Sequence, residues 1–251
     1  MKIGKQTIIF ENRPVILETG SAVGPKEKSG PLGEYFDTSV EDVYFGESTF
    51  EKAESKFMAE AIGIAINKSN LTMNDIDYAF AGDLLNQCIG SAFSIRDFGI
   101  PFIGLYGACS TMALSTALAS IFVESGISNK ALAVTSSHFC SAERQYRYPL
   151  NYGSQRTPTA QWTVTGSGAL ILEQNGKGPY INAVTFGEIE DFGVTDANNM
   201  GAAMAPDDVK IRPYPTNEGM VLFYTQIQYL RGFRALFKDF QSTKIYKKQW
   251  T

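Results

Sequence analysis

Histidine is almost missing from this chain of 251 residues, in which His138 is the only one. Its three cysteines, Cys88, Cys109 and Cys140, form no CxxC pair and have no spacing typical of a metal site. With so few nitrogen and sulfur ligands, no bound metal ion or other cofactor is expected. Unpaired cysteines also favour a reducing compartment over a secreted, disulfide-linked domain.

Long apolar runs are lacking as well. No run reaches the ~20 residues that a membrane-spanning helix needs, and residues 1–20 have no continuous apolar centre, so neither a transmembrane segment nor a signal peptide is expected. The net charge of −4 is unevenly distributed, because acidic residues exceed basic ones up to Pro206 and the balance reverses from Asp207 onward. We therefore expect a body over residues 1–206 and a basic tail over residues 207–251.

Short apolar runs that suit strands alternate with helical patterns along the body. Strands are predicted at 7–10, 15–19, 78–81, 100–105, 131–135, 163–173 and 180–189, and helices at 50–67, 89–98 and 110–123. Residues 12–14 suit a hairpin turn, and 24–37 hold too many helix and strand breakers for regular structure. Ser48 and Glu51 have capping-box spacing. The alternation predicts an α/β fold whose sheet is covered on its faces.

Cys109 lies where an apolar strand and Gly107 meet a helix, a position at which N–H groups and the helix dipole favour a thiolate or a bound anion. Ser110 adds a hydroxyl there. The alternative is that Cys109 is a small buried apolar residue, which is the interpretation we adopt for Cys88. The helix at 110–123 has no charged residue, so we expect protein on every side of it.

Polar side chains also follow two predicted strands, where α/β folds place ligands. Asp83 and Asn86 come after 78–81, although both could instead cap the next helix. His138 comes after 131–135, and a lone histidine there is more often structural than catalytic. Arg144 is a guanidinium source for a carboxylate ligand, or part of a solvated loop.

Six motifs occur in order along the body: GDLLNQ (82–87), GACST (107–111), TSSH (135–138), AERQYRYP (142–149), TVTGSGA (163–169) and MAP (204–206). With these motifs the chain resembles the stage V sporulation protein AD (SpoVAD) family of spore-forming Firmicutes over essentially residues 1–206. The resemblance implies a thiolase-like fold with α/β/α layers around a mixed sheet, of which this chain matches only the first half.

The resemblance further implies a forespore protein that binds dipicolinic acid (pyridine-2,6-dicarboxylate). It would help the SpoVA membrane proteins to move this acid, with calcium, into the spore, from the forespore cytoplasm or the surface of the spore inner membrane. Cys109 matches the thiolase nucleophile, and the family pocket also uses the regions of Asp83 and His138. Asn86, Ser110 and Arg144 are added on chemistry. Family members are not known as working acyltransferases, and the second half that supplies catalytic histidines in active relatives is not matched.

The tail has a helical pattern at Phe223, Ile227, Leu230, Arg234 and Phe237. It suits a helix packed on the body or lying on an anionic membrane, but we favour the hypothesis that the second half has been lost, for example through a frameshift, and that the tail has no selected function. Two other functions stay open: an acyltransferase whose Cys109 attacks a thioester, and a degenerate fragment that self-associates through its uncovered helix layer.

Overall fold

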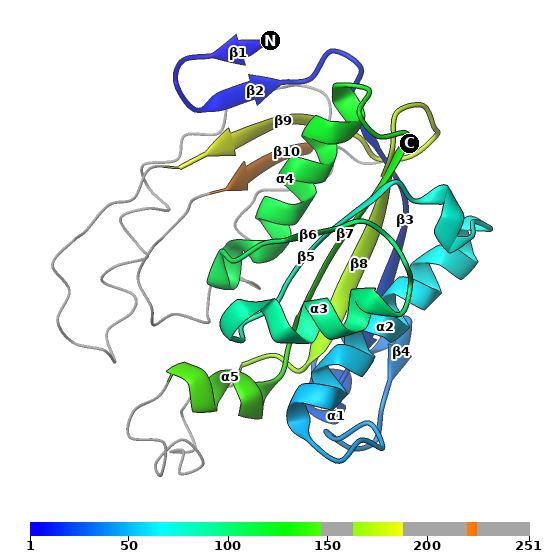
Figure 1. The fold of residues 1–251 in the computed structure, drawn as a ribbon, viewed down its shortest axis with the longest axis vertical. Coiled ribbons are helices and arrows are strands. Elements are labelled where there is room, and N and C mark those ends of the chain that lie inside the picture. Colours follow the sequence, from blue (N-terminus) through cyan, green and yellow to red (C-terminus); the bar gives the residue numbers. More distant parts are fainter. Residues whose placement is uncertain (147–162, 188–219, 225–251) are drawn as a thin grey trace, which may run out of the picture.

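The computed structural model describes residues 1–146, 163–187 and 220–224, and its largest feature is a mixed six-stranded sheet (Figure 1). In spatial order the strands are β4 (Thr38–Ser39), β3 (Val15–Val23), β8 (Gly166–Glu173), β7 (Lys130–Ser137), β5 (Tyr78–Gly82) and β6 (Phe102–Gly104). Strand β5 pairs in parallel with β7 and with β6, whereas β8 runs antiparallel to β7 and to β3. This arrangement confirms the predicted α/β fold with a mixed sheet.

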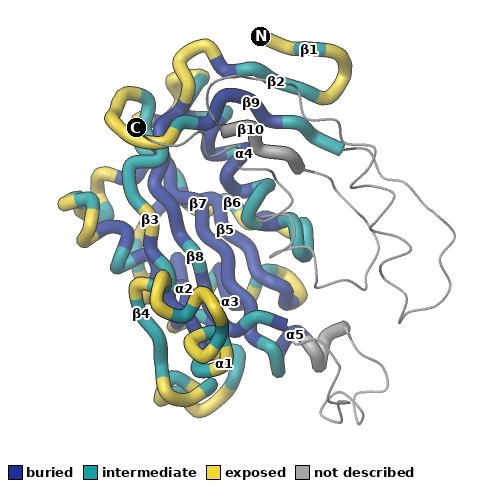
Figure 2. Tube along the Cα trace, turned by 180° about the vertical axis from the view of Figure 1, so that it is seen from behind, coloured by how far each residue is buried: buried dark blue, intermediate teal, exposed yellow. Residues whose placement is uncertain are grey.

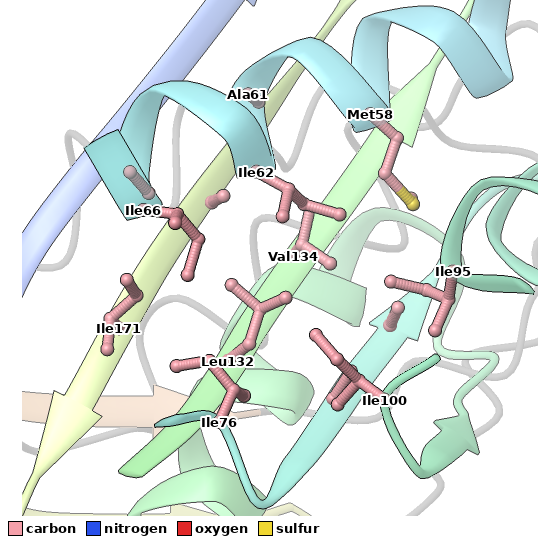
Figure 3. Close-up of a cluster of buried hydrophobic side chains, with 14 of the residues drawn as sticks. Met58, Ala61, Ile62, Ile66, Ile76, Ile95, Ile100, Leu132, Val134 and Ile171 are labelled. Atoms are coloured by element: carbon pink, nitrogen blue, oxygen red, sulfur yellow. The ribbon is translucent and has the colours of Figure 1, made fainter. Parts of the chain in front are cut away.

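Helices cover both faces of this sheet. Helices α2 (Phe50–Ser69) and α3 (Ile89–Arg96) pack on one face and α4 (Thr111–Glu124) packs on the other. Because side chains alternate along a strand, Leu132 and Val134 of β7 join the cluster beneath α2 (Figure 3), while Ala131 and Ala133 join the cluster beneath α4. The predicted α/β/α layering is therefore confirmed, and Figure 2 shows the central strands as the most deeply buried part.

The first long helix begins at Phe50, as the sequence predicted, but its cap lies one residue later than the predicted Ser48. The N-cap of α2 is Thr49, whose side-chain oxygen accepts a hydrogen bond from the Lys52 N–H at 3.3 Å, so the capping box predicted at Ser48 and Glu51 is wrong. The helix ends at Asn70, which has the left-handed backbone (φ 55°) common after a helix. A capping box does occur at the following 3-10 helix η2 (Met73–Asp75), between Thr72 and Asp75.

A second sheet contains the N-terminal strands. Its order is β1 (Lys2–Ile3), β2 (Thr7–Ile9), β9 (Ile181–Phe186) and β10 (Met220–Tyr224). Strand β2 pairs with β9, whereas β3 pairs with β8 in the larger sheet, so the hairpin predicted around residues 12–14 is wrong. The Glu124 carboxylate at the end of α4 instead holds this turn by accepting the N–H groups of Glu11 and Asn12.

The segment 24–37 was predicted to lack regular structure, but it contains two short helices. These are α1 (Pro25–Lys28) and the 3-10 helix η1 (Gly33–Tyr35). Pro25 stands at the start of α1, where its missing N–H costs nothing and its fixed φ suits a helix. Breaker residues therefore mark the start of a helix here as well as a turn.

Helix α4 has only two kinds of surface, buried and half-buried. Its sheet face includes Ser115, Thr116 and Ser120, whose hydroxyls donate to main-chain carbonyls of the same helix, so small polar residues lie in the core without lost hydrogen bonds. Leu118 and Ile121 pack against the cluster beneath α4 and are half-buried. No helix within the described ranges is both long and apolar enough to cross a membrane.

The tail departs from its predicted helical pattern at the first position. Phe223 lies in strand β10, which pairs in parallel with β9, and it is therefore not part of a helix. The other tail residues of the pattern, from Ile227 to Phe237, lie outside the described residues. Strand β10 also contacts α4, so part of the tail belongs to the folded body.

Candidate ligand-binding site at the sheet edge

The candidate site lies where strands β5, β6 and β7 end. These three strands are parallel neighbours, so their carboxyl ends meet at one edge of the sheet. Asp83 follows β5 directly, Cys109 lies in the turn after β6, and His138 follows β7. The structure thus brings these three predicted site residues to the edge at which α/β folds bind ligands.

Cys109 lies in the 3-10 turn η4 (Ala108–Ser110), directly before α4, and it is half-buried. Hydroxyls brace this turn, because Ser110 Oγ donates to the Gly107 carbonyl at 2.6 Å and Thr111 Oγ1 accepts the Gly107 N–H at 3.1 Å. The predicted placement of the thiol just before a helix is confirmed. Ser110 is a structural member of the turn, whichever ligand the turn binds.

Gly82 allows β5 to approach this turn closely. A Cβ atom at this position would lie 2.1 Å from the Leu105 carbonyl oxygen and 2.5 Å from Thr111 Cγ2, distances at which atoms overlap. Only glycine therefore fits between the end of β5 and the segment that carries Cys109.

Asp83 is buried, and its carboxylate binds the first turn of α3. One carboxylate oxygen accepts from the Leu85 N–H at 2.8 Å, and the other accepts from both the N–H and the hydroxyl of Ser91, each at 2.6 Å. Burial raises the pKa of Asp83, and these hydrogen bonds oppose the rise. The carboxylate thus binds an N–H group in the first turn of α3, as a capping side chain would, although the N-cap residue of α3 is Cys88. Asn86 is exposed in the 3-10 helix η3 (Asn86–Cys88).

Tyr106 and Cys88 belong to the same neighbourhood, although the sequence did not point to Tyr106. Burial raises the pKa of Tyr106, and the charges that Asp83, Cys88 and Cys109 carry when ionised add to the rise, which places Tyr106 within reach of each of them. The Cys88 thiol donates to the Leu105 carbonyl at 3.2 Å, and burial raises its pKa. Cys88 is therefore held as a neutral thiol.

His138 is fully buried on the face of the sheet that carries α2. Its Nδ1 accepts the Cys140 N–H at 3.2 Å, so the ring proton is on Nε2, which donates to the Val43 carbonyl at 2.8 Å. The ring lies against those of Phe50 and Phe139. Both nitrogens thus bind main-chain groups, as a structural histidine does, while Cys109 precedes α4 on the opposite face.

A buried carboxyl that the sequence analysis missed lies beside this group. Glu54 of α2 is completely buried, with Oε1 at 3.2 Å from Ser136 Oγ and Oε2 at 2.7 Å from Ser141 Oγ. Burial raises the pKa of Glu54 to about 8, and the charge of Asp83 adds to the rise. The sequence did contain a signal for the burial of Glu54. This residue lies four positions after Phe50 and four before Met58, on the apolar face of the helix.

Comparison with known proteins decides the family. The model of the family "Stage V sporulation protein AD (SpoVAD)" matches residues 4–213. The chain belongs to the SpoVAD family. It is 46% identical over 203 residues to the stage V sporulation protein AD of Bacillus subtilis (strain 168), and the alignment covers 81% of this chain. The alignment covers only 60% of that relative, so the chain spans less than two thirds of its length.

Solved structures with a similar fold include enzymes. The 3-oxoacyl-[acyl-carrier-protein] synthase III of Aquifex aeolicus is 16% identical, with a TM-score of 0.46 over 65% of this chain and 55% of the enzyme. A variant of OleA from Xanthomonas campestris is 14% identical, with a TM-score of 0.44 over 66% of this chain and 59% of that protein. Similarity at this level carries no conclusion about the activity of a SpoVAD chain.

Two further observations bear on the site of this SpoVAD chain. Arg144 lies in the backbone of α5 (Phe139–Tyr146), and its side chain is outside the described residues, so its role stays a prediction. A hollow of about 660 Å³ lies between α2 and α3, lined by residues such as Lys56, Phe93 and Arg96. None of the five predicted site residues whose side chains are described lines this hollow.

Proposed function

We propose that this SpoVAD-family chain binds dipicolinic acid at the sheet edge around Cys109 and assists its uptake into the developing spore with SpoVA membrane proteins. The observation that carries the proposal is the family membership together with a braced turn before α4, at the edge that also holds Asp83 and His138. In this role the chain would act in the forespore cytoplasm or at the spore inner membrane.

A flat aromatic dianion needs N–H donors, a cation and apolar walls. The N–H groups at the start of α4 would supply donors, and Arg144 would supply the cation. Asp83 is already engaged with α3, and as an anion it would repel the ligand, so we assign it the task of positioning the edge. Calcium would enter as cargo bound to the ligand. The described residues contain no group of three or more His, Cys, Asp and Glu side chains that could hold a metal ion.

Isothermal titration calorimetry with dipicolinate tests the proposal on the 251-residue chain and on Arg144→Gln. Loss of one charged hydrogen bond to a carboxylate should weaken binding by roughly tenfold or more. The matched control is Arg13→Gln, which removes the same charge from an exposed residue that contacts Tyr180. If the unchanged chain gives no heat of binding, the proposal that it binds dipicolinate is contradicted. If Arg144→Gln and Arg13→Gln bind dipicolinate with equal affinity, the assignment of Arg144 is contradicted.

A further inference from the structure

Glu54 links three separate elements at the site edge. It belongs to α2, its Oε1 lies 3.2 Å from Ser136 Oγ at the end of β7, and its Oε2 lies 2.7 Å from Ser141 Oγ in the first turn of α5. All three residues are buried. The joint also lies next to His138, whose carbonyl receives the Ala142 N–H at the start of α5.

The hydrogen bonds around Ser141 favour a protonated Glu54 carboxyl group. Ser141 Oγ lies 3.2 Å from the His138 carbonyl oxygen as well as 2.7 Å from Glu54 Oε2. The Ser141 hydroxyl has one proton, and the His138 carbonyl oxygen can only accept a hydrogen bond. When Ser141 donates its proton to this carbonyl, Ser141 Oγ can bond to Glu54 only by accepting a proton from the carboxyl group. This chain of two hydrogen bonds is complete only when Glu54 is protonated.

The charges around Glu54 favour the same state. Asp83, beyond the end of β5, accepts three hydrogen bonds and can keep its negative charge, whereas Glu54 has only two hydroxyl partners among the described residues. The negative charges of Asp83 and of Glu51 on α2 both raise the pKa of Glu54, while Ser136 on β7 and Ser141 on α5 lower it. Of the two buried carboxyls, Glu54 therefore holds the proton at neutral pH.

We propose that Glu54 is a proton-binding residue that joins α2 to the start of α5 in its protonated form, and that its ionisation loosens this joint. This inference does not depend on which ligand the chain binds. Ionised Glu54 would be a second buried negative charge near Asp83, and no cation is among the described groups that act on its pKa. The segment from His138 to Ala142 would then lose its brace against α2.

The sign of the pH dependence follows from the raised pKa. A carboxyl with a pKa of about 8 in the folded chain and 4.5 as its ordinary value contributes its full stability below 4.5 and loses it as the pH rises through about 8. Across that window each pH unit increases the unfolding equilibrium constant by up to about tenfold. Asp83, whose pKa is also raised by burial, acts in the same direction.

The test measures urea unfolding of the whole chain from about pH 5 to about pH 9. Glu54→Gln keeps the shape and both hydroxyl contacts but cannot ionise. Over this pH range the unfolding equilibrium constant of the unchanged chain should therefore increase at least about tenfold more than that of Glu54→Gln. The matched control is Glu60→Gln, on the same helix but exposed, which should behave as the unchanged chain does. Equal pH dependence in all three proteins would overturn the proposal.

Infrared spectroscopy provides a readout that does not require a folded variant. At neutral pH the unchanged chain should show the carbonyl stretch of a protonated carboxylic acid, and this band should disappear with a midpoint near pH 8. Glu60→Gln should keep the band, and Glu54→Gln should lack it. If the unchanged chain shows no such band at neutral pH, Glu54 is ionised and the proposal is wrong.

Discussion

At the scale of single residues, one glycine in a strand and one in a helix have opposite requirements. Gly82 ends a strand with a carbonyl oxygen and a methyl group directly where a side chain would begin. Gly63 lies in the middle of α2 with nothing within 4 Å of the same position. The first glycine is required by a close approach, whereas the second only weakens its helix.

We therefore predict that Gly82→Ala and Gly63→Ala change stability in opposite directions. Gly82→Ala should lower the free energy of unfolding by about 2–4 kcal/mol, because the end of β5 must move away from Leu105 and Thr111. Gly63→Ala should raise it by about 0.5–1 kcal/mol through helix propensity. Urea titrations measure both. If Gly82→Ala destabilises the chain no more than an ordinary surface substitution does, β5 does not approach the turn this closely.

At the scale of secondary-structure elements, α2 depends on its ends as well as on its packing. Its N-cap hydrogen bond comes from Thr49, although Ser48 is an equally good capping residue one position earlier. Local sequence could not separate the two candidates, because the register of the helix is set by which side chains reach the core. Phe57, Met58 and Ile62 all lie fully buried against the sheet in that register.

Alanine substitutions at the two candidate caps should distinguish them. Thr49→Ala should lower the free energy of unfolding by about 0.5–2 kcal/mol, because the Lys52 N–H loses its acceptor. Ser48→Ala should change it by less than about 0.5 kcal/mol, as expected for a residue outside the cap. Thermal or urea unfolding of both variants decides the matter. Equal costs at the two positions would mean that the capping register drawn from the structure is incorrect.

Elements that depend on local patterns were predictable, and those that depend on distant pairing were not. The strand, glycine turn and helix around Cys109 were visible in the sequence, because each signal is local. Strand β10 was missed, since Phe223 has helical spacing to later residues and only its pairing with β9 makes it a strand. Glu54 was missed because a glutamate on an amphipathic helix usually faces water, and only the serines of β7 and α5 show that this one does not.

At the scale of the whole molecule, the half-buried residues of α4 bear on whether the chain stays monomeric. Leu114, Leu118 and Ile121 pack against the cluster beneath α4 but stay half-buried, on a helix that has no charged residue before Glu124. The aligned part of the B. subtilis relative is only 60% of its length, so this relative has further chain with which such a surface could be covered. Among the described residues, these side chains are only partly covered, although β10 also contacts α4.

We predict that the chain self-associates through the half-buried side of α4. Apolar area contributes ~25 cal/mol per Å², so covering a few hundred Å² contributes several kcal/mol toward association, part of which offsets the lost freedom of the two chains. Sedimentation velocity should show dimers or larger species, and Leu118→Glu should shift the chain toward monomer by placing a charge in the contact. The matched control is Ile127→Glu, an exposed position beyond the end of α4, which should leave the distribution unchanged. An unchanged chain that sediments as a monomer at every concentration would show that the half-buried side of α4 needs no partner.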